Sequence, residues 1–406
     1  GISRAGAAII DSNKFISSNN GIYVNANAIF TNNTIDARSI SSASQFVNNN
    51  IFLHAANNHL SFGKRFNGNT LQYFNRPSSN SYVIMTNSDS AEFIGNTIKY
   101  VGYPSQVYGD AYLTQIFNGA IVKDNTFVDN QNPLKVGNRA VVSNNTFQGG
   151  YYGIYVDNAH SQIDHNIFYN VGFPISFQNN SSGTIFNNTI YASSNMSSES
   201  IKITNSAPSV KNNTISGYAT GISASNAIKN YNLAYNNFYN VTTPFTGTAL
   251  PPLVGQFVDK NANNDDADIY KNVSLDPKFV NPDSMDFRLQ AISKLINAGD
   301  PTIKDPDSTV SDIGALPFYI AVVMRHTPLT NTSDITNPYA VSAEVFSPKG
   351  NAVTAKVWYR VNGGSYSALT MTKGSGNTFT ANIPKQAMNS RVDYYLQGSD
   401  DTSSVY

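Results

Sequence analysis

The strongest constraint on the fold of this chain is one short phrase that returns throughout its first 240 residues. The phrase places Asn-Asn-Thr, followed by Ile or Phe, between apolar residues; "TIFNNTIYAS" at residues 184–193 is one copy. Aligned on the asparagine two residues before its last apolar position, it falls at eleven positions, 16 to 29 residues apart: Asn13, Asn33, Asn49, Asn69, Asn96, Asn125, Asn145, Asn166, Asn188, Asn213 and Asn236. Self-similarity at this period is typical of a solenoid, in which each repeat is one coil.

Each repeat also carries a second short phrase upstream, such as "GIYV" at 153–156 and "PISF" at 174–177. Apolar and polar residues alternate in these phrases with period two, which indicates strands buried on one face. Parallel strands stacked by a coiling chain form a parallel β-helix. At about 4.8 Å per coil, ten steps predict a rod about 50 Å long.

The repeated asparagine has a structural explanation in such a fold. Every coil must turn at nearly the same place, and asparagine tolerates left-handed backbone conformations and bonds to neighbouring backbone groups. Stacked asparagines can form a ladder in which each amide bonds to the next. The Asn-x-Thr triplets also match N-glycosylation acceptors, but the repeat explains them without that role. We therefore expect a structural asparagine ladder.

Composition excludes several classes of partner and site. The 26 basic and 26 acidic residues balance, so the chain offers no general attraction to nucleic acid or anionic membranes. Cysteine is absent, which excludes disulfides and cysteine-ligated metals. No apolar run is long enough to span a bilayer.

The two ends predict that the chain is a piece of a longer precursor. It begins with Gly1, enters the repeat almost at once, and stops at Tyr406 within what resembles an unfinished module. Richness in Asn, Ser, Thr and Tyr with few charges is typical of exported proteins, so we expect an extracellular or cell-surface location.

The pattern changes after Asn237, where we expect the ladder to stop. Residues 235–318 resemble the carboxyl-terminal segment of secreted bacterial right-handed parallel β-helix proteins of the pectate-lyase-like superfamily. The positions that match are Asp276, Pro277, Phe279, Asp286, Phe287, Leu289, Ser293, Ile296, Ala298, Gly299, Asp300 and residues 312–315. The resemblance implies a right-handed β-helix over residues 1–318, with its last coils closed by residues 238–318.

The remaining chain, residues 319–406, has strands of a different kind. Val357, Tyr359 and Val361 alternate with polar residues, and "NGGS" at 362–365 predicts a hairpin turn. This segment resembles the immunoglobulin- or fibronectin-III-like modules appended to secreted bacterial enzymes and adhesins. We predict a small β-sandwich, incomplete at its end, that serves as a spacer or attachment unit, with a structural role for Trp358.

One acidic run offers ligands for a metal. Asp259, Asn261, Asn263 and Asp265, followed by Asp266 and Asp268, present the alternating oxygen ligands that Ca²⁺ favours. The run lacks the glycine and glutamate that complete a helix-loop-helix calcium loop, and the alternative is a solvated turn. No other cofactor is expected. The five histidines are scattered and indicate no metal centre: His54, His59, His160, His165 and His326.

Alternation along the strand phrases predicts which side chains face outward. With Leu134, Val136, Ile154, Val156, Ile175, Phe177, Ile201 and Ile203 inward, two outward columns follow. One reads Lys135, Tyr155, Ser176, Lys202 and Ser223; the other reads Gly137, Asp157, Gln178, Thr204 and Ser225.

A carbohydrate groove is predicted beside these columns. The two longest repeats, of 27 and 29 residues, precede Lys135 and carry Tyr73, Tyr103, Tyr108 and Tyr112. Aromatic rings stack on sugar faces, so we expect the loops of these repeats to fold over the sheet. The ligand-binding candidates are these four tyrosines together with Tyr155 and Gln178.

Two functional classes remain open. The superfamily resemblance implies a polysaccharide lyase, in which a Lys or Arg removes the proton α to a uronate carboxylate while Ca²⁺ or Arg neutralises it. Lys135 with Arg139 or Lys202 would fill those roles. A glycosidase needs two facing carboxylates, for which Asp157 and Asp110 are candidates. The other class is a non-catalytic rod that displays an adhesive or sugar-binding face to a polysaccharide, a cell surface or a secretion-system component. Because the sequence offers few candidate catalytic residues, we favour the non-catalytic rod.

Overall fold

The computed structural model describes residues 8–22, 27–53, 60–73, 82–86, 88–100, 112–116, 118–132, 134–226, 232–248, 250–318, 322–347, 350–400 and 404–405. The chain divides into two compact units. The first comprises Gly1–Ile303 and Val310–Pro317; the second comprises Lys304–Thr309 and Phe318–Tyr406. The division after Pro317 lies next to the boundary expected from the sequence.

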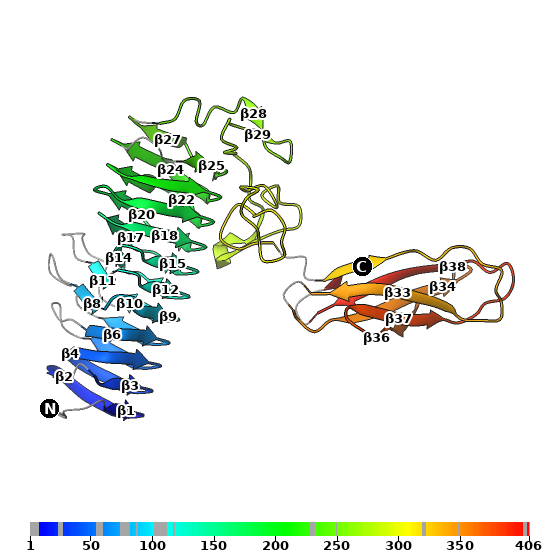
Figure 1. The fold of residues 1–406 in the computed structure, drawn as a ribbon, viewed down its shortest axis with the longest axis horizontal. Coiled ribbons are helices and arrows are strands. Elements are labelled where there is room, and N and C mark those ends of the chain that lie inside the picture. Colours follow the sequence, from blue (N-terminus) through cyan, green and yellow to red (C-terminus); the bar gives the residue numbers. More distant parts are fainter. Residues whose placement is uncertain are drawn as a thin grey trace. The chain divides into compact units, whose positions relative to one another are not determined.

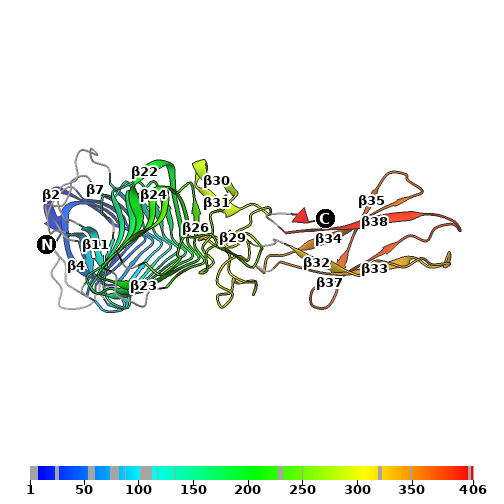
Figure 2. The ribbon, with the colours of Figure 1, turned by 90° about the horizontal axis from the view of Figure 1, so that it is seen from above.

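The first unit is a parallel β-helix, as the repeat predicts (Figure 1). Each coil presents strands on three faces, and every strand pairs in parallel with the equivalent strand of the next coil (Figure 2). Face 1 contains the outward columns expected to bind sugar, face 2 follows it in each coil, and face 3 completes the coil. The asparagine turn joins face 2 to face 3.

Face 1 is formed by β8 (Tyr82–Thr86), β11 (Tyr112–Ile116), β14 (Leu134–Val136), β17 (Tyr152–Asp157), β20 (Phe173–Gln178) and β27 (Thr243–Gly247). Face 2 is formed by β1 (Ile9–Asp11), β3 (Ile29–Thr31), β9 (Glu92–Ile94), β12 (Ile121–Lys123), β15 (Val141–Ser143), β18 (His160–Asp164), β21 (Ser182–Phe186), β23 (Ala207–Lys211) and β25 (Leu233–Ala234).

Face 3 is formed by β5 (Asn50–Leu53), β7 (Thr70–Tyr73), β10 (Thr97–Tyr100), β13 (Thr126–Val128), β16 (Thr146–Gln148), β19 (Ile167–Tyr169) and β26 (Asn237–Tyr239). Long strands continue around a corner from one face to the next: β2 (Lys14–Ile22), β4 (Thr34–Val47), β6 (Leu60–Asn67), β22 (Thr189–Thr204) and β24 (Thr214–Ser225). The pairing register of β2, β4 and β22 shifts within these long strands.

Columns of identical or similar side chains fill the interior of the β-helix. Phe127, Phe147 and Phe168 stack with ring centroids 4.8 and 4.7 Å apart and nearly parallel planes. All eight residues predicted to point inward from face 1 are at most 2% exposed. Since the side-chain period of a strand is two, a slip of one residue would expose every member of these columns, and the packing therefore fixes the register between coils.

In the asparagine turn, one residue takes the left-handed backbone conformation and the next residue forms the hydrogen bonds of the ladder. The residue before each ladder asparagine takes the left-handed conformation; for example, φ is 56° at Asn144 and 50° at Asn187. From Asn33 onward the ladder asparagine itself is buried; for example, Asn145 Nδ2 donates to Asn166 Oδ1 at 2.9 Å, and Asn145 N donates to the same oxygen. The same bonds connect all eleven asparagines on which the repeat was aligned.

The expectation that the ladder stops after Asn237 is wrong. Asn236 donates from N and Nδ2 to Asn272 Oδ1, at 2.9 and 3.0 Å, so Asn272 is a further rung. Asn272 in turn donates from N and Nδ2 to the carboxylate of Asp268. An ionised carboxylate only accepts hydrogen bonds. The side chain of Asp268 therefore has no N–H group to donate to a further rung, and it ends the ladder.

The earlier part of the segment expected to close the last coils does so: Val273 N donates to the carbonyl of Asn236, and Leu250 and Val254 pack against the core. Its later part lies along the side of earlier coils. Asn187 Nδ2 donates to the carbonyls of Asp312 and Gly314, at 2.9 and 3.1 Å, and Gly314 N donates to the carbonyl of Asn212. Asp300 N donates to Asn212 Oδ1. Residues 297–303 and 310–315 of this unit therefore cover the outside of the asparagine turns, where Asn187 and Asn212 point away from the core.

A hairpin in the same segment covers face 3. It contains β30 (Phe279–Asn281), the 3-10 turn η1 (Pro282–Ser284) and β31 (Asp286–Leu289), which pair in antiparallel. The ring of Phe287 lies 5.3 Å from that of Tyr191 and 6.2 Å from that of Tyr169, both on the outer side of face 3. The hairpin therefore shields tyrosines that would otherwise face solvent.

Acid is expected to weaken the docking of this segment. Lys211 Nζ lies 2.7 Å from Asp300 Oδ2, and the side chain of Asp300 is only 7% exposed. Burial alone raises the pKa of Asp300, but hydrogen bonds from Lys211 and Thr302 outweigh it and lower that pKa. Because the folded-state pKa lies below the unfolded one, the carboxylate contributes stability above about pH 4, and this contribution is lost as the pH falls through the folded value.

The test compares the wild type with Asp300→Asn by urea unfolding between pH 2 and pH 7. The variant is expected to be less stable at pH 7 by about 1 kcal/mol, with the difference vanishing in acid. Parallel pH profiles for the two proteins would contradict the assignment.

The second unit is a β-sandwich of two antiparallel sheets. One sheet has the order β32-β33-β37-β36 and the other β35-β34-β38-β39. Their bounds are β32 Val323–His326, β33 Tyr339–Phe346, β34 Thr354–Val361, β35 Ser367–Thr370, β36 Thr372–Lys373, β37 Thr378–Ile383, β38 Val392–Ser399 and β39 Ser404–Val405. Val341, Val357 and Phe379 lie in the core between the sheets. The predicted hairpin turn is present, with positive φ at Asn362 and Gly363.

Candidate functional site

The two outward columns on face 1 are in the register that the alternation predicts, although Ser176 and Ser223 of the first column are buried. Lys135 pairs in register with Tyr155, Tyr155 with Ser176, and Ser176 with Lys202. In the neighbouring column, Asp157 pairs with Gln178. The columns cross successive coils, so they run along the axis of the β-helix.

A continuous set of polar contacts joins these columns. The Nζ of Lys135 lies 3.5 Å from Asp157 Oδ2 and 5.7 Å from the centre of the Tyr155 ring. The hydroxyl of Tyr155 donates to Gln178 Oε1 at 3.3 Å, and Gln178 Nε2 donates to Ser176 Oγ at 3.1 Å. We call Lys135, Tyr155, Asp157, Ser176 and Gln178 the face-1 patch. These contacts hold the ring and the charges of the patch in place before any ligand binds.

The three cations predicted for lyase chemistry do not form one cluster. Lys202 lies three strand spacings from Lys135, which is about 14 Å, and its Nζ lies 3.6 Å from Glu199. Arg139 lies in the turn between β14 and β15, with φ at 59°, rather than on face 1. Its backbone N–H donates to the carbonyl of His160 on the next coil.

The tyrosines predicted to line a groove are distributed differently. Tyr73 is the last residue of β7 and is 5% exposed, with its ring 5.0 Å from that of Tyr100, so it belongs to the core rather than to a loop. The alternation of β7 places this ring inward. Tyr103, Tyr108 and Asp110 lie outside the described residues, as does the side chain of Tyr112 at the start of β11. The predicted groove therefore stays a prediction.

Of the residues that the sequence analysis did not select, one contacts the patch and three form a separate ring cluster at the start of the same strands. Asn179 Nδ2 donates to Asp157 Oδ1 at 2.8 Å, from the turn after β20. Tyr151, Tyr152 and Phe173 form a half-buried ring cluster at the start of β17 and β20, with centroids 4.9 to 5.3 Å apart. Two adjacent tyrosines, Tyr151 and Tyr152, stand just before the "GIYV" phrase, one coil before Phe173. This pair is the feature of the sequence from which the cluster could have been predicted.

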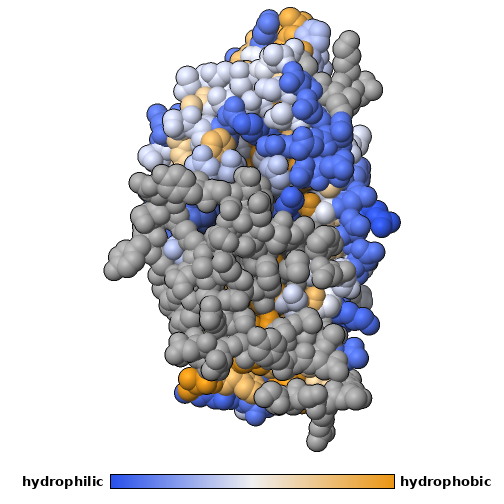
Figure 3. All heavy atoms as spheres, turned by 90° about the vertical axis from the view of Figure 1, so that its left-hand side faces the viewer, coloured by the Kyte–Doolittle hydropathy of each residue, from blue (hydrophilic) through white to orange (hydrophobic). Residues whose placement is uncertain are grey.

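Figure 3 views the side of the β-helix that lies at left in Figure 1 and carries face 1. The described atoms in its upper part are mostly hydrophilic, with scattered apolar spots. Such a surface suits a polar ligand better than an apolar one.

The acidic run predicted for calcium is engaged by lysines. Asp259 Oδ2 lies 2.5 Å from Lys271 Nζ, while Asp266 pairs with Lys260 and Asp265 with Lys294. Asn261 Oδ1 accepts from the backbone N–H groups of residues 263 and 265, and Asn263 Nδ2 donates to the carbonyls of residues 294 and 296. The strands β28 (Asp259–Lys260) and β29 (Asp266–Ala267) hold the run as a hairpin. Calcium binding by this run stays a prediction.

Two absences can be stated for the described ranges. They contain no group of three or more His, Cys, Asp or Glu side chains able to hold a metal ion. Within the same ranges, no helix has the length and apolar character needed to cross a membrane.

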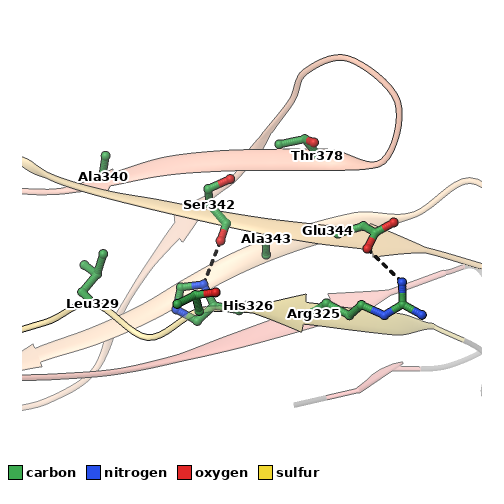
Figure 4. A pocket seen from close by; sticks show the side chains of 9 residues that line it. Arg325, His326, Leu329, Ala340, Ser342, Ala343, Glu344 and Thr378 are labelled. Carbon is green, nitrogen blue, oxygen red and sulfur yellow. Dashed lines mark hydrogen bonds and ion pairs between the residues drawn. The ribbon is translucent and has the colours of Figure 1, made fainter.

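A hollow of about 500 Å³ lies on the sandwich, beside β32, β33 and β37 (Figure 4). Its polar groups bond to one another: Arg325 lies 3.1 Å from Glu344, and His326 Nδ1 donates to the carbonyl of Ser342 at 2.7 Å. His326 Nε2 lies 2.9 Å from the hydroxyl of Tyr394, which also accepts from Leu329 N. These bonds tie β32 to β33 and β38, so His326 has a structural role.

Comparison with known proteins supports the architecture. Residues 112–264 match the family model described as a right handed beta helix region. The matched range covers the coils that carry the face-1 patch and the ladder rungs from Asn125 to Asn236. The fold of the first unit is thus a right-handed parallel β-helix. No curated protein matches its sequence.

Proposed function

We propose that the protein is an exported, non-catalytic rod that binds a polysaccharide along face 1 of its β-helix. The observation that carries this proposal is the face-1 patch, in which Lys135, Tyr155, Asp157 and Gln178 are connected across successive coils. Lys135 and Asp157 are about a quarter exposed, so both are supported by neighbours yet open to a ligand. A row of this kind along the axis suits a linear chain of sugars, which repeats in one direction.

The positions of the cations favour binding over lyase chemistry. A lyase needs a base and a carboxylate-neutralising group at one sugar residue. Lys135 and Lys202 are separated by Tyr155 and Ser176, and Arg139 lies in a turn. In the structure Lys135 is paired with Asp157 and Lys202 with Glu199, on strands three spacings apart, an arrangement that suits contacts with successive sugars better than with one.

The sandwich supports the attachment role expected from the sequence. Its two strand orders, β32-β33-β37-β36 and β35-β34-β38-β39, correspond to the ABED and C′CFG sheets of immunoglobulin-like modules. A rod joined in one chain to such a module suits display at a cell surface or in a larger extracellular assembly.

Binding and cleavage can be separated in one experiment. The intact chain is incubated with a uronate-containing polysaccharide, and affinity electrophoresis and the absorbance of unsaturated uronates are followed in parallel. We expect retardation without product. Tyr155→Ala and Lys135→Ala should each weaken binding about tenfold, because each removes an anchoring group of the patch.

Lys123→Ala is the matched control, since Lys123 also pairs with an aspartate, Asp124 at 3.7 Å, but on face 2. It should leave binding unchanged. Product formation that is lost in Lys135→Ala would instead establish the lyase, and equal binding by all three variants would remove the face-1 patch from consideration.

A further inference from the structure

Aromatic side chains gather on the outer side of the sandwich sheet that contains β34 and β38. Trp358 on β34 pairs in register with Tyr395 on β38; their ring planes differ by 6°, and their centroids are 6.1 Å apart. Tyr366, from the turn after β34, places its ring 5.0 Å from that of Tyr395. Tyr366 and Tyr395 are 38% and 37% exposed. Three rings thus lie together on a face rather than in the core.

Hydrogen-bonding and charged groups surround these rings at the same level of the sheet. Trp358 Nε1 donates to Gln397 Oε1 at 2.8 Å, which fixes the indole. The guanidinium of Arg360 lies 4.9 Å from the centre of the Tyr366 ring and donates to Asp393 at 3.1 Å. Arg391 also bonds to Asp393, at 2.8 Å.

The face carries a positive excess. Lys356, Arg360 and Arg391 lie around the rings, with Asp393 as the carboxylate that pairs with both arginines. The fixed charges of this face therefore favour an anionic ligand.

The composition of the face argues for a sugar rather than a protein partner. Outward positions alternate with buried ones along β34 and β38, and the described outward residues are aromatic, charged, amide or hydroxyl-bearing. They include Lys356, Trp358, Arg360, Asp393, Tyr395 and Gln397, with no large aliphatic residue among them. Protein interfaces bury a more apolar centre, whereas aromatic rings beside amides and cations match the apolar faces, hydroxyls and carboxylates of an acidic sugar.

We propose that Trp358, Tyr366 and Tyr395 form a second binding site, on the sandwich, for an acidic oligosaccharide. The rings stack on the sugar faces, while Lys356 and Arg360 contact the carboxylates. This site is independent of the face-1 patch, because it lies on a different unit and shares no residue with it.

The chain provides its own reporter for this site, since Trp358 is its only tryptophan. The intact protein is titrated with oligogalacturonate while tryptophan emission is recorded, with a neutral glucan oligosaccharide of equal length as the comparison ligand. We expect a saturable change with the acidic ligand only. Lys356→Gln should weaken it and flatten its salt dependence, because a charge contact is lost.

Matched variants separate the ring from its hydroxyl. Tyr395→Ala should weaken the response about tenfold, whereas Tyr395→Phe keeps the ring and should retain it. The double variant Lys135→Ala/Tyr155→Ala removes two anchoring groups of the face-1 patch and should leave the tryptophan response intact. The proposal for the sandwich and the proposal for face 1 can therefore fail separately. An unchanged emission with every ligand would overturn the sandwich site, and an equal response to the neutral oligosaccharide would overturn its assignment to acidic sugars.

Discussion

Replacing Asn166 with alanine is expected to lower the free energy of unfolding by about 3 kcal/mol. Asn166 is fully buried, and its Nδ2 donates to the Val142 carbonyl and to Asn188 Oδ1, at 2.9 and 3.0 Å. Its Oδ1 accepts from N and Nδ2 of Asn145. Alanine would leave donors and acceptors on both neighbouring coils buried without these partners, which costs more than the loss of one exposed hydrogen bond.

Urea unfolding measures this change, and hydrogen exchange at the Asn145 amide locates it. Asn13→Ala is the matched control, because Asn13 occupies the exposed first position of the ladder and should cost far less. Asn166→Asp should be worse than alanine at neutral pH, since its second oxygen would face two acceptors. That repulsion disfavours the ionised form, so the aspartate variant should gain stability as the pH falls. Equal losses at Asn166 and Asn13 would show that the ladder does not hold the coils together.

Replacing Asp268 with asparagine is expected to cost about 2–4 kcal/mol, although the change removes a buried charge. Oδ1 of Asp268 accepts from the backbone N–H groups of Tyr270 and Asn272, both at 2.9 Å. Oδ2 accepts from Asn272 Nδ2 at 2.9 Å and from Gly255 N at 2.7 Å. Whichever way the new amide turned, its NH₂ group would meet two donors.

The loss should be local to the end of the β-helix. Hydrogen exchange at the amides of Gly255 and Tyr270 should rise in Asp268→Asn, while that of Asn145 stays slow. Asp266→Asn is the control: its side chain is 76% exposed and pairs with Lys260 in solvent, so the substitution should leave the stability nearly unchanged. Slow exchange at Gly255 in the Asp268 variant would mean that the carboxylate does not end the ladder.

The sequence alone determined the repeating architecture. The position of the asparagine in each repeat and the alternation around Lys135 and Tyr155 predict the coils, the buried columns and the outward columns. These features can be predicted from the sequence because every coil of a parallel β-helix repeats the same local environment. The same spacing of apolar and turn residues must therefore recur in every coil.

The sequence did not reveal the partners that come from outside the repeat. Asn272 joins the ladder 36 residues after Asn236, and Asp268 ends it, yet neither carries the repeated phrase. Asp300, Asp312 and Gly314 meet Asn187 and Asn212 about a hundred residues earlier in the chain. Tyr73, which seemed to belong to a loop, is buried, and Trp358 lies on an outer face beside Tyr395.

The physical reason is that some features depend only on residues adjacent in the sequence, whereas others depend on residues that are far apart in it. Period-two alternation fixes on which side of a strand a residue lies, and it needs only neighbouring residues. Whether that side is then covered, and by which amide, carboxylate or ring, depends on chain segments brought together after the coils have stacked. The tertiary structure alone decided how the ladder ends, what shields face 3 and which rings remain exposed on the sandwich.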